Sequence, residues 1–156
     1  MRLYLVQHAK ALSKEVDPER PLTSAGWKET KSMALFISEY IKLIVTKIYH
    51  SKATRSIDTA EILEEYLAPA NGIEQLEFLN PNDPIEPFLN KLKTIHNNVM
   101  IVGHLPYLNK LSNFLLDLPP ETESVKFCNS GLISLEKTEE KWTLSWKISP
   151  EDLLTD

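Results

Sequence analysis

The sequence predicts a single-domain α/β fold: a three-layer sandwich in which helices cover both faces of a mostly parallel sheet, with antiparallel strands at the C-terminus. Two observations support this prediction. Short, almost unbroken apolar runs, typical of strands buried on both faces, alternate with segments whose apolar residues follow helical spacing. The length of 156 residues also suits one domain, which we expect to span residues 1–156.

The N-terminal part predicts a strand followed by a helix. Residues 3–6 form the first apolar run. A polar stretch follows, and Pro18 and Pro21 keep it out of helix. Thr23 is then the expected N-cap, because its hydroxyl can accept from the backbone amides ahead of it. Apolar residues at helical spacing continue from there to Ile41.

The middle of the chain repeats this alternation. The β-branched run 44–49 predicts a second strand, and an apolar face across 57–67 predicts a helix that ends before Pro69. Residues 76–79 are expected to form a short strand. Two prolines interrupt the chain after it, and a further helix is expected over 85–95.

The last part predicts one more strand and helix, then a pair of strands. The run 99–102 is a buried strand, and leucines at helical spacing mark a helix over 108–115. Two tail strands are expected near 132–136 and 143–147, the second with an alternating pattern. We also expect Cys128 to be a small core residue in a strand.

Composition excludes several classes of function. The 17 basic and 22 acidic residues give a net charge of −5, which argues against nucleic-acid binding and against a polybasic membrane patch. No apolar stretch is long enough for a membrane span or a signal peptide. A lone cysteine cannot form an internal disulfide, so nothing demands an oxidising compartment. We therefore expect a cytoplasmic protein.

Polar residues follow three of the predicted strands. His8 follows the first, Ser51 to Arg55 the second, and His104 the strand over 99–102. In open α/β sheets, ligands bind in the crevice beyond the carboxyl ends of the strands. We therefore expect these residues to share one site. His50 and His96 lack this placement, and we interpret both as structural.

Two histidines and an arginine in one crevice suit phosphoryl transfer. Neutral imidazole is a competent nucleophile near pH 7, and guanidinium can hold two phosphate oxygens at once. We expect the second histidine to be protonated and to stabilise the equatorial oxygens. The sequence has no P-loop and no zinc or magnesium ligand pattern, so we expect neither a metal nor another cofactor.

Four segments, taken in order, resemble the histidine phosphatase superfamily and point to its SixA-type phosphohistidine phosphatase branch. They are Leu5-Val6-Gln7-His8-Ala9, Arg20-Pro21-Leu22-Thr23-Ser24-Ala25-Gly26, Ser51 to Ala60, and Val102-Gly103-His104-Leu105-Pro106. The resemblance implies a phosphoglycerate mutase-like fold and a metal-independent phosphatase. It implies that His8 is the phosphate-accepting nucleophile and that Arg55 and His104 complete the phosphate pocket. We assign substrate-binding roles to four further residues of these segments: Gln7, Arg20, Ser51 and Leu105.

Gln7 is a departure from the superfamily pattern, which has Arg before the nucleophile. Glutamine donates hydrogen bonds but has no charge, so the pocket lacks one cation. We expect a basic residue of the loops to restore the charge. Arg20 is the first choice, because it stands just before the helix-start motif, and the alternatives are Lys10, Lys14 and Lys52.

A second departure concerns the general acid that superfamily members use on phosphate esters. An ungapped placement puts Phe78 at that position; Glu77 is one residue away, where a strand would direct it to the opposite face, and Asp83 lies in the following loop. An imidazole leaves with less acid help than an alcohol, because its conjugate acid has a far lower pKa. The expected substrate is therefore phosphohistidine on a partner protein, such as a phosphotransfer domain or carrier.

Two other functions stay open at this stage. One is a phosphatase for small phosphate esters that uses Glu77 or Asp83 as the acid. The other is a phosphate- or phosphoprotein-binding module with impaired turnover, which the uncharged Gln7 motivates.

Overall fold

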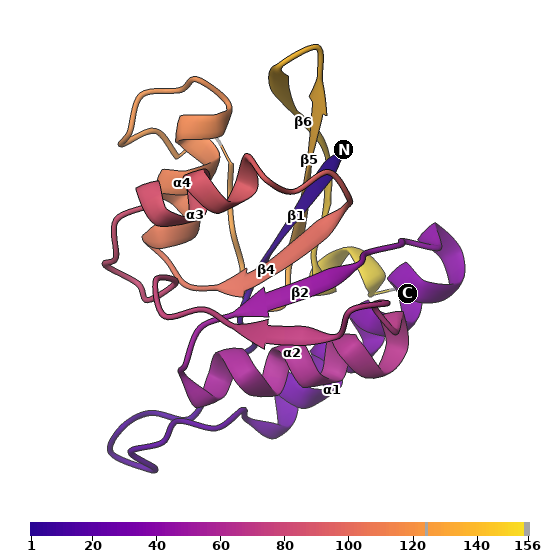
Figure 1. Ribbon diagram of the computed structural model, residues 1–156. Coiled ribbons are helices and arrows are strands. Elements are labelled where there is room, and N and C mark those ends of the chain that lie inside the picture. The colour runs from indigo at the N-terminus through magenta and orange to yellow at the C-terminus, as the bar shows by residue number, and fades with distance from the viewer. Residues whose placement is uncertain (124, 155–156) are drawn as a thin grey trace.

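The computed structural model describes residues 1–123 and 125–154, and within them the chain forms one six-stranded sheet in the order β3-β2-β4-β1-β5-β6 (Figure 1). Four strands run parallel, and the last two run antiparallel to their neighbours. This confirms the predicted α/β fold with antiparallel C-terminal strands. The strands are β1 (Arg2–Gln7), β2 (Lys47–His50), β3 (Ile73–Gln75), β4 (Val99–Gly103), β5 (Leu132–Thr138) and β6 (Lys141–Ile148).

Helices cover both faces of the sheet (Figure 1). On one face lie α1 (Ser24–Phe36), its π-helical continuation η1 (Ile37–Ile41) and α2 (Thr54–Leu67). The other face carries α3 (Glu86–Leu92) and α4 (Tyr107–Leu115), and a short 3-10 helix, η2 (Pro150–Leu153), packs near α1. Among the described residues, no helix is long and apolar enough to span a membrane.

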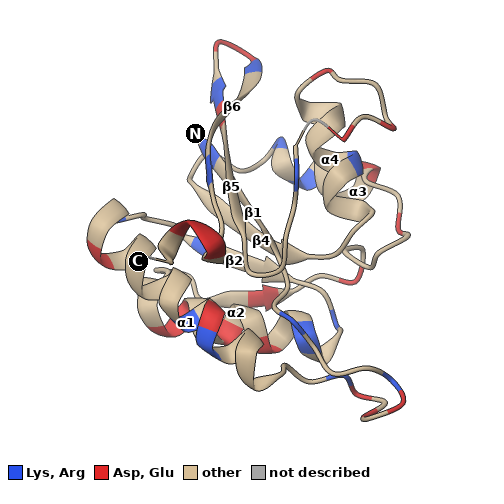
Figure 2. Ribbon diagram, turned by 180° about the vertical axis from the view of Figure 1, so that it is seen from behind, with Lys and Arg blue, Asp and Glu red and all other residues tan. Residues whose placement is uncertain are grey.

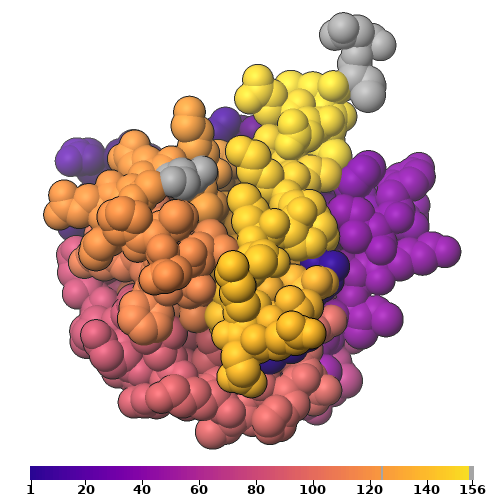
Figure 3. Space-filling model, turned by 90° about the horizontal axis from the view of Figure 1, so that it is seen from above, coloured from indigo at the N-terminus to yellow at the C-terminus, as the bar shows by residue number. Residues whose placement is uncertain are grey.

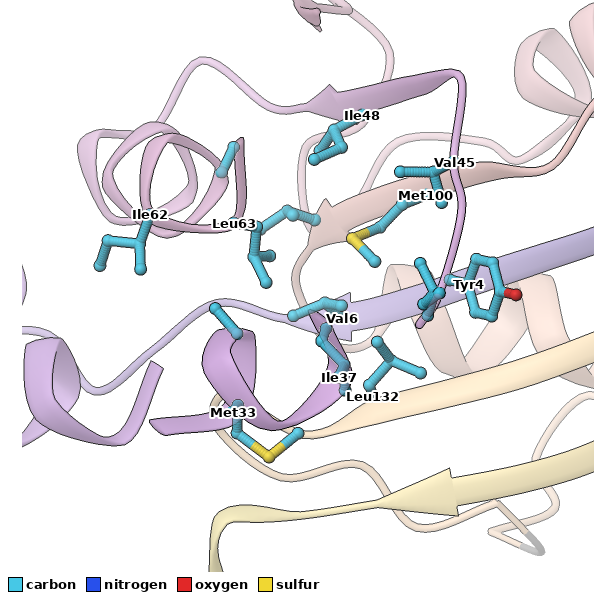
Figure 4. Close-up of a cluster of buried hydrophobic side chains, with 14 of the residues drawn as sticks. Tyr4, Val6, Met33, Ile37, Val45, Ile48, Ile62, Leu63, Met100 and Leu132 are labelled. Carbon is cyan, nitrogen blue, oxygen red and sulfur yellow. The ribbon is translucent and has the colours of Figure 1, made fainter. Parts of the chain in front are cut away.

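Alternating side chains of the buried strands divide the apolar core into two layers. Leu3 and Leu5 of β1 face α3 and α4, whereas Tyr4 and Val6 face α1 and α2. This is the two-residue period of a strand buried on both faces. Figure 4 shows the second layer, in which residues of the strands meet residues of the helices. It labels Tyr4, Val6, Ile48, Met100 and Leu132 from strands, Val45 from the loop before β2, and Met33, Ile37, Ile62 and Leu63 from helices.

The start of α1 anchors the long loop that precedes it. Thr23 is the N-cap, as predicted, and its hydroxyl accepts from the backbone N–H of Gly26 at 2.9 Å. The loop crosses the helix start so closely that a Cβ on Gly26 would lie 2.3 Å from the carbonyl oxygen of Lys10. That oxygen also accepts from the N–H of Thr23. The loop therefore enters α1 in a fixed position. It carries both acidic and basic residues (Figure 2).

Two local predictions are wrong. Residues 76–79 are not a strand: β3 ends at Gln75 and the chain then turns, so Leu76 and Leu79 bury their side chains from a turn. Cys128 is neither in a strand nor in the core, because it lies exposed in the loop before β5. In both cases apolar residues of an irregular segment give the sequence pattern of a strand.

Candidate active site

Parallel pairing brings the three predicted strand ends together. Gln7 of β1 lies in register with Gly103 of β4, and the N–H of His8 donates to the oxygen of Gly103 at 3.0 Å. The rings of His8 and His104 consequently lie 5.0 Å apart between centroids, tilted by 55°. Because β2 lies on the other side of β4, Ser51 enters the same region.

The tautomer of His8 follows from one hydrogen bond. Its Nδ1 lies 2.8 Å from the carbonyl oxygen of Ala9, which can only accept, so the ring hydrogen is on Nδ1. Nε2 therefore keeps its lone pair. Burial lowers the pKa of His8 below 6.5; the hydrogen bond to Ala9 opposes this shift, and the charges of Arg55 and Arg20 add to it. His8 is thus neutral at pH 7, the state that a nucleophile needs.

His104 is almost fully buried, with 2% of its surface exposed. Its Nε2 lies 2.6 Å from Oγ of Ser51, and its Nδ1 is buried without a partner among the described residues. Burial lowers the pKa of His104 to about 3, helped by the charges of Arg55 and Arg20 and by that of His8 once acid protonates His8. The ring is therefore neutral in the ligand-free protein, whereas the predicted protonated state concerns His104 with a phosphoryl group in the site.

Arg55 and Arg20 supply the positive charge of the site. Arg55 lies in the first turn of α2, and its buried Nε has no partner within the described part of the chain. Arg20 adopts a left-handed backbone with φ of 50°, and its Nε donates to the oxygen of Leu12 at 2.9 Å. The charged side chains that shift the pKa values of His8 and His104 are cationic, so the site favours an anion.

Gln7 and Leu105 occupy different parts of the site. The Oε1 atom of Gln7 is buried, and no described residue gives it a hydrogen bond. Leu105 directly follows His104 and is 42% exposed, so part of its side chain is open to a molecule that approaches from solvent. The predicted binding residue Ser51 differs from both, because it is completely enclosed.

Structural comparison supports the resemblance seen in the sequence. The protein histidine phosphatase SixA in complex with tungstate superposes with a TM-score of 0.83 at 25% identity, over 99% of this chain and 100% of that chain. SixA from Agrobacterium tumefaciens gives a TM-score of 0.77 at 24% identity, over 96% of this chain and 97% of that one. A phosphoserine phosphatase from Entamoeba histolytica gives a TM-score of 0.76 at 14% identity, over 98% of this chain and 99% of that one. No family model and no curated protein matches the sequence.

The chain is homologous to the histidine phosphatases. These enzymes are hydrolases that work without metals. The described residues include no group of three or more His, Cys, Asp or Glu side chains that could hold a metal ion. The positive charge that acts on His104 in the folded protein comes from Arg55 and Arg20.

Neither candidate acid contributes to the pKa shifts of His8 and His104, and each has a hydrogen-bond partner elsewhere. Glu77 is exposed and accepts from Nε2 of Gln75, and Asp83 accepts from the N–H of Asn80 at 2.8 Å. Glu77 lies in a turn, so the strand-based reason for pointing it away is wrong. Phe78 packs against the core on the α3 and α4 side.

The remaining basic candidates, all lysines, do not contribute to the pKa shifts of His8 or His104. Lys10 pairs with Glu29 at 3.3 Å, and Lys14 and Lys52 are exposed. The two histidines interpreted as structural have different surroundings. His50 is buried and its Nδ1 donates to the oxygen of Ser51. His96 is exposed and lines a cavity of about 860 Å³ together with Met1 and residues at the tip of the β5–β6 hairpin. Figure 3 shows the molecule from above, with the yellow C-terminal segment beside the orange segment that contains α4.

Sequence reasoning missed two residues that hold the nucleophile in place. Thr59 of α2 accepts from the N–H of Ala9 at 2.9 Å, and Nδ2 of Asn129 donates to the oxygen of His8 at 2.8 Å. Thr59 lies within the matched segment around Arg55, which was the available signal. Asn129 lies in none of the four segments, and only the fold brings it to His8.

Proposed function

We propose that the protein removes phosphate from phosphohistidine side chains of a partner protein through a covalent phosphohistidine at His8. The observation that carries this proposal is the state of His8, which is neutral and has an Nε2 lone pair beside a cluster of cationic groups. Two of the similar structures are SixA phosphatases, one of which binds tungstate, an oxyanion with the shape of phosphate. The cytoplasm is the proposed compartment, because a lone cysteine needs no oxidising environment.

The reaction proceeds in two displacements. Nε2 of His8 attacks phosphorus while the bond from phosphorus to the substrate's imidazole nitrogen breaks. That imidazole leaves as a neutral ring when its other nitrogen already carries a proton. Water then attacks phosphorus, the bond to Nε2 of His8 breaks, and the water protons leave with the inorganic phosphate. Arg55 and His104 hold the phosphoryl oxygens in both steps.

The position of the carboxylates favours phosphohistidine over an alkyl ester. An alkoxide leaves only with protonation by a placed acid, and such assistance is worth about 10²–10⁴-fold. Glu77 and Asp83 are engaged by Gln75 and Asn80, and neither acts on the pKa of His8 or His104. An imidazole leaving group needs far less protonation by an acid. The site therefore suits cleavage of the bond between phosphorus and an imidazole nitrogen.

Arg20 is the residue that we propose to compensate for Gln7. Its charge lowers the pKa of His8, Arg55 and His104, so it acts on every member of the site. A left-handed φ is uncommon for arginine and carries strain, which tends to persist where function requires it. Gln7 itself then contributes hydrogen bonding without charge.

The test compares kcat/KM on a phosphohistidine-bearing protein and on an alkyl phosphate, for wild type, Glu77→Gln and Asp83→Asn. We expect a clear preference for phosphohistidine and little effect of either substitution on it. If kcat/KM on the alkyl phosphate equals or exceeds that on phosphohistidine and is lost in one of the variants, the protein is a small-ester phosphatase. Phosphate binding without turnover of either substrate would identify the protein as a phosphate- or phosphoprotein-binding module.

A further inference from the structure

The hydroxyl of Ser51 is turned away from solvent and into the frame of the site. Ser51 follows β2 and is completely buried, and its Oγ lies 2.6 Å from Nε2 of His104. Its backbone N–H donates to Oγ of Ser56 at 3.1 Å, and the hydroxyl of Ser56 donates to the oxygen of Val102 in β4 at 2.9 Å. Ser56 therefore links the end of β2 to the end of β4, which His104 directly follows.

Counting hydrogens identifies the donor in the short contact. A serine hydroxyl has one hydrogen and two lone pairs. Oγ of Ser51 already accepts from the N–H of Ala53 at 3.4 Å. Nε2 of His104 is the one acceptor that the described residues offer to its hydrogen. The hydroxyl consequently donates to Nε2, and the hydrogen of the neutral ring is on Nδ1.

We propose that Ser51 is a positioning residue that fixes His104 as the neutral tautomer with its hydrogen on Nδ1. His104 then acts on the phosphoryl group as a neutral hydrogen-bond donor and adds no charge to the site. The expected effect of Ser51 on turnover rests on the function proposed above, whereas its effect on the tautomer of His104 does not.

The surroundings of His104 fit a neutral donor. The groups that act on it are His8 from the end of β1, Arg55 from α2 and Arg20 from the loop before α1. All three favour the uncharged ring, and burial favours it most. Nδ1 of His104 is one of the buried polar atoms without a partner among the described residues. Such atoms are rare in folded proteins and are often explained by a ligand, an ion or a catalytic role.

The first experiment measures the tautomer of His104 in the wild-type protein without substrate, from its long-range ¹H–¹⁵N correlations by NMR at pH 7. We expect the pattern of a neutral ring protonated on Nδ1. A ring protonated on Nε2, or an imidazolium, would overturn the proposal. Because the measurement needs no turnover, it remains informative even when the proposed function fails.

The second experiment compares Ser51→Ala with Ser51→Thr, which keeps the hydroxyl. We expect Ser51→Ala to lose the single tautomer and to lower kcat about tenfold, with a smaller change in KM, because one buried hydrogen bond is removed. Ser51→Thr should recover both. The matched control is Ser112→Ala, which removes an equally buried hydroxyl that donates to Asn109 within α4. A folded Ser51→Ala protein with the tautomer and kcat of wild type would refute the role of Ser51.

Discussion

Acidification should destabilise the protein through His104 in particular. The ring is neutral in the folded state, with a pKa of about 3, whereas the unfolded chain has the ordinary value of 6.5. Between about pH 3 and pH 6.5, His104 binds a proton in the unfolded state but not in the folded state. The free energy of unfolding therefore falls as the pH drops below 6.5, and the contribution of His104 stops falling near pH 3.

The magnitude at pH 5 depends on the unfolded pKa alone, since the folded ring is still neutral there. The pH lies 1.5 below the unfolded value of 6.5. At 1.36 kcal/mol for each pKa unit, His104 costs about 2 kcal/mol of stability at pH 5 relative to pH 8. That is a substantial part of the roughly 5–15 kcal/mol that a domain of ordinary stability has.

Urea unfolding of wild type and His104→Gln between pH 8 and pH 5 measures this term. The two proteins are free to differ in stability at pH 8, because only the change in their difference matters. We expect that difference to move by about 2 kcal/mol in favour of the variant at pH 5. His8 titrates in both proteins, so its contribution cancels. A difference that stays constant across this range would show that His104 is not held neutral and would refute the reasoning.

The other predictions concern the chemistry of the site. His8→Ala should abolish turnover yet unfold at nearly the wild-type urea concentration, because His8 lies outside both apolar core layers. Arg20→Ala should weaken vanadate inhibition at least several-fold, whereas the exposed Lys14→Ala control should not; equal inhibition of both would exclude Arg20 as the compensating cation. Exhaustive EDTA treatment should leave turnover unchanged, as in homologues that work without metals, and an activity restored by added Mg²⁺ or Zn²⁺ would contradict this.

Features governed by local chemistry could be predicted from the sequence. The buried strands reveal themselves by apolar runs, and Thr23 caps its helix because the cap needs only the residues that follow it. His8 and His104 could be predicted to share a site because parallel strands end at one edge of a sheet.

Features that depend on packing could not be predicted. The protonation of His104 is set by burial and by charges from three distant segments, none of which is visible in its neighbouring residues. Asn129 reaches the oxygen of His8 only because β5 pairs beside β1. Ser51 belongs to a matched segment, yet only the folded chain shows that its hydroxyl faces His104 and not the solvent.

The transfer of phosphate to His8 is the central claim, and a phosphoenzyme assay tests it most directly. The protein is mixed with a radiolabelled phosphohistidine protein, quenched within the first turnover, and divided between acid and base before the labelled residue is mapped. We expect a label on His8 that survives base, is lost in acid and is absent from His8→Ala. An acid-stable label, a label on another residue, or unchanged phosphate release by His8→Ala would contradict the account.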